Sequence, residues 1–116
     1  MPKGIFLAVA DAADGARHDD FNQWYDDVHA KEVLALPGVK SCTRYKAAGT
    51  QLMEGDETGG QYLAVYEIEV DDWADFQAAM LAGFTEGRIT INPDLLQMDP
   101  MVKTMVFEEV SPRVDA

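Results

Sequence analysis

The sequence predicts an α+β fold in which two helices cover one face of a four-stranded antiparallel sheet. Four short segments are apolar or alternate between apolar and polar residues, which is typical of strands. Two longer segments carry apolar residues at intervals of three and four, which is typical of helices. The chain has 116 residues, the length of one domain. We expect a single domain over residues 1–110 and a frayed C-terminal tail over residues 111–116.

The first strand is expected at residues 4–10, a nearly continuous apolar run that suits a strand covered on both faces. Small and polar residues at 11–17 predict a loop. The first helix is expected over residues 18–36, where aromatic and aliphatic side chains recur with the helical period. Two aspartates favour the positive end of its dipole, and Pro37 and Gly38 end it.

The second and third strands are expected at residues 39–45 and 61–70, joined by a glycine-containing connection at 47–60. The alternation in the third strand places five apolar side chains on one face: Tyr62, Ala64, Tyr66, Ile68 and Val70.

The second helix is expected to begin after Asp72, with four large apolar residues at helical spacing: Trp73, Phe76, Met80 and Phe84. Residues 83–101 are less regular, with a turn at 92–93 and one helical turn at 94–98. This segment is long enough to act as a lid or as an arm of a dimer. The fourth strand is expected at residues 102–110.

The resulting order, β-α-β-β-α-β, is the ferredoxin-like pattern. The sheet face away from the helices also carries apolar residues, and four strands leave it exposed unless a partner covers it. A second copy of the same sheet is the simplest cover, because most oligomers are symmetric dimers. We therefore expect a homodimer with two sheets packed face to face.

Composition and charge exclude several classes of function. Hydrophobic residues make up 47% and charged residues 26% of the chain, as in soluble globular proteins. The net charge of −12 opposes binding to nucleic acid and to anionic membranes. No apolar run approaches the roughly 20 residues that span a bilayer, and no signal peptide is evident. The single cysteine, Cys42, forms no internal disulfide and no cysteine-based zinc site. We expect a cytoplasmic protein.

The first helix carries the strongest candidate for chemistry, His29. Phe21, Tyr25, His29 and Val33 are four residues apart and share one face of the helix. An imidazole between helix and sheet could act as a general acid or base, because its ordinary pKa is near 6.5. Tyr25 could assist with its hydroxyl from one turn away. The alternative is that His29 hydrogen-bonds a backbone carbonyl and fills space.

Arg44 is the other polar candidate, on the second strand. An inward arginine needs a carboxylate or a bound anion, and Glu67 or Glu108 on a neighbouring strand could supply the carboxylate. The spacing of the two histidines predicts no metal site, and no glycine-rich loop predicts a nucleotide site.

The residues 21–29, read as Phe-Asn-Gln-Trp-Tyr-Asp-Asp-Val-His, with Leu36-Pro37-Gly38 and Arg44-Tyr45 after them, resemble the dimeric α-β barrel superfamily. The resemblance is closest to its EthD-like and stress-responsive small proteins. It implies a homodimer with a pocket between each sheet and its helices. Enzymes of the superfamily include polyketide cyclases, muconolactone isomerases, cofactor-free monooxygenases and haem proteins. The haem-binding members use a later histidine, and no histidine follows His29 here.

These observations lead to one hypothesis and two alternatives. The hypothesis is a small cofactor-independent enzyme that acts by acid/base chemistry on an apolar oxygenated molecule, aromatic or polyketide-like. His29 and Tyr25 are its expected catalytic residues, with no cofactor and no metal. Its expected substrate-binding residues are Trp24, Arg44, Tyr62, Tyr66, Trp73, Phe76 and Phe84. The alternatives are a non-catalytic or stress-related homodimer that binds a small molecule, and an accessory subunit of an oxygenase cluster.

Overall fold

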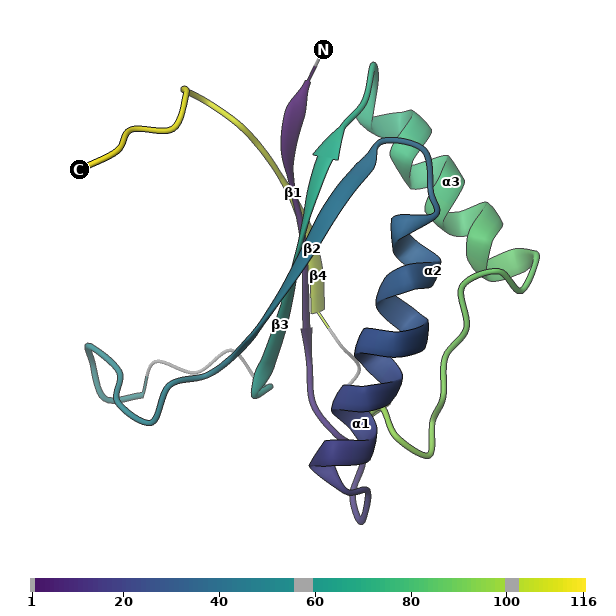
Figure 1. The fold of residues 1–116 in the computed structure, drawn as a ribbon, viewed down its shortest axis with the longest axis vertical. Coiled ribbons are helices and arrows are strands. Elements are labelled where there is room, and N and C mark those ends of the chain that lie inside the picture. Colours follow the sequence, from purple (N-terminus) through teal and green to yellow (C-terminus); the bar gives the residue numbers. More distant parts are fainter. Residues whose placement is uncertain (1, 56–59, 100–102) are drawn as a thin grey trace.

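Four antiparallel strands form one sheet in the order β2-β3-β1-β4 (Figure 1). The computed structural model describes residues 2–55, 60–99 and 103–116. The strands are β1 (Lys3–Ala10), β2 (Val39–Lys46), β3 (Tyr62–Glu69) and β4 (Lys103–Glu108). The predicted α+β class and the β-α-β-β-α-β order are confirmed. The predicted start of the fourth strand, Val102, lies outside the described residues.

The helices lie on one side of the sheet (Figure 1). The first is continuous but has three segments, α1 (His18–Trp24), η1 (Tyr25–His29) and α2 (Ala30–Leu34). The middle segment is a π-helix, in which the backbone N–H of Ala30 donates to the carbonyl of Tyr25 five residues earlier. The sequence predicts an ordinary α-helix here, so the wider turn is a difference from that expectation. The second helix is α3 (Trp73–Thr85), capped by the Asp72 side chain on the N–H of Ala74.

The strand register decides which side chains face the helices. Phe6 of β1 lies between Tyr66 of β3 and Val106 of β4, and all three share the inner face. The five residues predicted for one face of β3 are all buried, at 8% exposure or less. Phe21, Tyr25, His29 and Val33 of the first helix, also 8% exposed or less, pack toward them. The core therefore lies between the sheet and the helices, and it also includes Phe76 of α3 and Ile89 and Leu96 after it.

The outer face of the sheet is apolar and exposed in the single chain. Leu7 pairs with Met105 and Ile5 pairs with Phe107, so these side chains share that face. Met105 is 58% exposed and Phe107 is 44% exposed. Figure 1 shows the connection after β2 and the tail after β4 extending on this side, away from the helices.

Residues 86–99, which we call the strap, follow α3 and return along the first helix. The N–H of Ala13 donates to the carbonyl of Leu95 at 2.7 Å, which ties the strap to the loop before α1. Ile89 is buried against Gly83 of α3, where a β-carbon would approach Ile89 Cδ1 to 2.6 Å. The predicted helical turn at 94–98 is instead a turn at 93–95, built on hydrogen bonds to Asn92.

Candidate functional site

A cavity of about 870 Å³ lies between the sheet, α3 and the first helix. Among the residues that the structure describes, its lining contains no aspartate, glutamate, lysine or arginine. The polar lining groups are His29, Tyr25, Tyr66, Gln77 and Thr104. The remaining lining residues are Phe6, Ala8, Val33, Trp73, Ala74, Phe76, Met80, Leu81, Phe84, Ile91, Leu96 and Val106. The cavity is therefore an apolar chamber with one imidazole in its wall.

His29 is held through one of its two ring nitrogens. Its Nδ1 lies 3.0 Å from the carbonyl oxygen of Thr90, in the strap. A carbonyl can only accept, so Nδ1 carries the hydrogen and Nε2 is left with its lone pair in the neutral ring. The alternative prediction included a hydrogen bond from His29 to a backbone carbonyl, and the structure has one. This bond uses Nδ1, so Nε2 stays available to accept a proton from a substrate.

Burial lowers the pKa of His29 below its ordinary value, because an imidazolium loses hydration there. The Thr90 carbonyl and the Glu32 carboxylate act in the opposite direction, and Arg44 adds to the lowering. Burial is the largest influence, so His29 is neutral near pH 7. A neutral imidazole with a free Nε2 is the form of histidine that accepts a proton.

The π-helix brings Trp24 onto His29. The two rings stack with centroids 5.0 Å apart and planes at 26°. Residues five apart point in different directions on an α-helix, but the i→i+5 turn of a π-helix brings them together. Tyr25 also contacts the imidazole, edge to face at 4.9 Å. The two aromatic rings and the Thr90 carbonyl fix the orientation of His29.

The hydroxyl of Tyr25 belongs to a separate polar group with Tyr66 and Cys42. The three influence one another's pKa values, and burial raises the pKa of each. The Tyr66 hydroxyl is fully buried, and neither neighbour is placed for a hydrogen bond of regular geometry with it. Tyr25 therefore meets His29 with its ring, while its hydroxyl lies with Tyr66.

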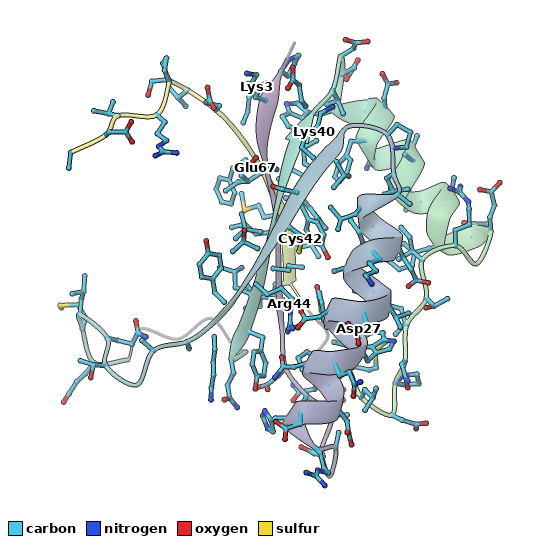
Figure 2. All side chains as sticks on the ribbon, viewed as in Figure 1. Lys3, Asp27, Lys40, Cys42, Arg44 and Glu67 are labelled. Atoms are coloured by element: carbon cyan, nitrogen blue, oxygen red, sulfur yellow. The ribbon has the colours of Figure 1, made fainter. Side chains whose placement is uncertain are left out.

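Arg44 reaches from β2 to the first helix (Figure 2). Its guanidinium donates to Asp26 Oδ1 at 2.8 Å and to Asn22 Oδ1 at 2.9 Å. It also lies over the ring of Tyr25, with Cζ 4.2 Å from the centroid. The prediction that Glu67 or Glu108 supplies the carboxylate is wrong. The carboxylate belongs to Asp26 of η1, because Arg44 lies on the face of β2 that is directed toward this helix.

The cavity brings together six of the nine predicted site residues, namely Tyr25, His29, Tyr66, Trp73, Phe76 and Phe84. The other three lie elsewhere. Trp24 stacks on the ring of His29 and does not line the cavity. Arg44 joins β2 to the first helix, and the Tyr62 hydroxyl forms a hydrogen bond with His18 Nδ1 at 2.7 Å.

Sequence reasoning missed the contribution of the strap. Thr90 acts through its backbone carbonyl, which no side-chain pattern reveals, while Ile91 and Leu96 line the cavity. The signal available was the set of apolar residues in the strap, Ile89, Ile91, Leu95, Leu96 and Met98, which indicates that part of this segment is buried.

No group of three or more His, Cys, Asp or Glu side chains in ranges 2–55, 60–99 and 103–116 could hold a metal ion. None of the helices within those ranges has the length and apolar character needed to cross a bilayer.

Comparisons with known proteins place this fold. An EthD family protein from Bacillus halodurans, named after ethyl tert-butyl ether, is 17% identical, with a TM-score of 0.60 over 95% of this chain and 100% of that one. A dimeric ferredoxin-like protein of unknown function from Thermobifida fusca is 16% identical, with a TM-score of 0.53 over 93% of this chain and 92% of that one. HapK from Hahella chejuensis is 19% identical, with a TM-score of 0.54 over 100% and 99%.

These likenesses show the fold, and the sequence itself shows the family. A search of curated proteins found no match. The sequence pattern of the EthD domain matches residues 13–95, which include the first helix, the strands β2 and β3, α3 and most of the strap. That match covers well over half of the chain, and the protein therefore belongs to the EthD domain family.

Proposed function

We propose that this protein is a small cofactor-independent enzyme in which His29 is the general base for an uncharged, apolar, oxygenated substrate. The observation that carries the proposal is the hydrogen bond from His29 Nδ1 to the Thr90 carbonyl, which leaves Nε2 free on a residue that lines an apolar cavity. A burial-lowered pKa keeps that nitrogen unprotonated near neutral pH.

The lining favours a substrate without charge. A carboxylate or phosphate would enter the cavity without a lysine or arginine from the described lining, in a protein whose net charge is −12. Aromatic and aliphatic side chains form most of the wall, and about 870 Å³ suits a molecule of several fused or linked rings. An aromatic or polyketide-like compound fits this description.

The chemistry would be movement of a weakly acidic proton. Nε2 takes a proton from carbon or oxygen of the substrate, and the imidazolium can return it to another position, as in an isomerisation or cyclisation. Tyr25 supports the base through its ring contact, and Tyr66, Trp73, Phe76 and Phe84 hold the substrate. A positioned base of this kind contributes about 10²–10⁴-fold to a rate.

The test uses a nitrobenzisoxazole, a neutral aromatic probe for a base in an apolar site. Loss of its ring C–H proton to Nε2 breaks the N–O bond and forms a coloured cyanonitrophenolate. We expect His29→Ala to lower this rate at least about tenfold with the fold unchanged by circular dichroism. His18→Ala is the matched control, because His18 lies outside the cavity lining. Equal rates in the wild type and His29→Ala would contradict the proposal.

The non-catalytic alternative predicts a different result. A binding protein or an accessory subunit would take up the neutral probe, visible as quenching of tryptophan fluorescence, without accelerating its conversion. Binding with no His29-dependent turnover would favour that alternative.

We also propose that two chains pair through the outer face of the sheet. Met105 and Phe107 are exposed there, next to β1 residues of the same apolar face. The connection after β2 and the C-terminal tail extend on the same side of the sheet (Figure 1), and these segments include Leu52, which is 99% exposed, and Val110, which is 98% exposed. Both segments are therefore placed to contact a second copy of the chain. A stable interface needs roughly 1,200 Å² or more in total, and sedimentation equilibrium tests the assembly.

A further inference from the structure

Thr90 in the strap is held from both sides by the first helix. Its backbone N–H donates to Glu32 Oε1 at 3.0 Å, and its hydroxyl lies 2.9 and 3.0 Å from the two Glu32 oxygens. On its other side, its carbonyl accepts from His29 Nδ1 at 3.0 Å. Glu32 and His29 are three residues apart, so one helical turn presents both groups to the same strap residue.

The direction of these bonds matters for His29. Without a bound Thr90 carbonyl, either ring nitrogen of a neutral imidazole can carry the hydrogen. The carbonyl selects Nδ1, and its position depends on the bonds that Glu32 makes to the same residue. Glu32 is only 20% exposed by its side chain, so its bonds to Thr90 are partly shielded from competing water.

The carboxylate also lies near the imidazole itself. Glu32 Oε1 is 3.8 Å from His29 Nδ1. The other charged group that acts on His29 is Arg44 of β2, and Tyr25 is the titratable side chain in ring contact with it. The strap presents the uncharged Thr90, and among the described residues the cavity lining that includes His29 and α3 carries no Asp, Glu, Lys or Arg. Among the residues that the structure describes, Glu32 is therefore the carboxylate placed to stabilise an imidazolium at this position.

We propose that Glu32 is a positioning residue for His29: by holding Thr90 it fixes the imidazole with Nε2 free, and by its charge it supports the protonated ring that forms when a proton is taken. The same bonds anchor the strap, whose Ile91 and Leu96 line the cavity. The inference rests on the proposed role of His29 as the base.

Long-range nitrogen–proton NMR of the whole protein reads both the tautomer and the titration midpoint of His29 without any substrate. In the wild type we expect the Nδ1–H form. Glu32→Gln keeps an oxygen that can accept from Thr90 but removes the charge, so the midpoint should fall by about one unit. Glu32→Ala removes the acceptors, so both tautomers of His29 should appear. The midpoint of the pH–rate profile with the nitrobenzisoxazole should shift with the NMR midpoint.

Asp27→Asn is the matched control. Asp27 is an exposed carboxylate on the same helix, its removal changes the net charge by the same amount, and it should leave the tautomer and midpoint unchanged (Figure 2). Glu32 variants indistinguishable from Asp27→Asn would overturn the inference. A pure Nδ1–H form in Glu32→Ala would overturn it too, because Glu32 would then act as a charge alone. The NMR results need no turnover, so an inactive wild type contradicts only the proposed function.

Discussion

The indole ring of Trp24 stacks on the imidazole of His29, five residues further along the chain, with their centroids 5.0 Å apart. This contact exists because the intervening residues form a π-helix, in which groups five apart meet. The indole covers one face of the imidazole while Thr90 holds its edge. The wide turn therefore contributes to the burial that keeps His29 uncharged.

Replacing Trp24 tests that contribution. In Trp24→Leu the imidazole gains contact with water, so its pKa should rise toward the ordinary histidine value. The lost packing should lower the free energy of unfolding by about 1–3 kcal/mol, less than for a fully buried tryptophan. NMR titration of His29 and urea unfolding measure the two effects. Tyr45→Leu is the control, since Tyr45 is 53% exposed and lies outside the cavity lining, and it should leave the His29 titration unchanged.

Arg44 provides a prediction about the support of the π-helix. Arg44→Met keeps an unbranched side chain but loses the bonds to Asp26 and Asn22 and the position over Tyr25. We expect a loss of about 1–3 kcal/mol, most of it from the Asn22 bond and the ring contact, because Asp26 is 58% exposed and its ion pair is screened. Urea unfolding measures it. Arg88→Met removes an exposed pair with Glu86 and should change stability by less than about 0.5 kcal/mol.

The sequence predicts most of the fold because helices and strands that bury only one face carry apolar residues at regular intervals along the chain. Phe21, Tyr25, His29 and Val33 were expected on one face of the helix, and their burial confirms it. Spacing of four keeps residues aligned in both α- and π-turns closely enough for that prediction to hold. The π-turn itself has no sequence signature, so the stacking of Trp24 could not be foreseen.

The sequence also does not predict which side chains meet when distant segments of the chain pack together. Arg44 was expected to pair within the sheet, but the helix lies over β2 and offers Asp26 at 2.8 Å. The partner of His29 is a backbone carbonyl of the strap, 61 residues away. Every residue carries a carbonyl, so composition and spacing hold no information about which one a histidine will meet.

The outer sheet face gives a prediction about assembly. A glutamate in place of Met105 would put a charge into the proposed interface, where desolvation is costly. We expect the wild type to sediment as a dimer at micromolar concentration and Met105→Glu to sediment as a monomer of 12.8 kDa. Gln23→Glu adds the same charge at an exposed helical position and should stay dimeric. A wild type that is a stable monomer would exclude this interface.

The final prediction concerns how stability depends on pH through His29. An unfolded histidine binds a proton near pH 6.5, whereas burial lowers the pKa of His29 in the folded protein. Between those two values the unfolded chain binds more protons, so the folded state loses stability as the pH falls. The contribution of neutral His29 is thus complete above about pH 6.5 and disappears progressively below it, until the folded pKa is passed.

His29→Gln isolates this effect. At pH 7.5 the variant should be less stable by about 1–3 kcal/mol, because the bond to Thr90 is lost or weakened. Below about pH 6.5 the gap between the two proteins should narrow, since the wild type alone loses the histidine contribution. Urea unfolding at several pH values between 5 and 7.5 measures this difference in the free energy of unfolding. His18→Gln is the control, and its difference from the wild type should not show this narrowing. A gap that stays constant over this range would mean that His29 takes up its proton equally well folded and unfolded, and would remove the basis for a neutral base in the cavity.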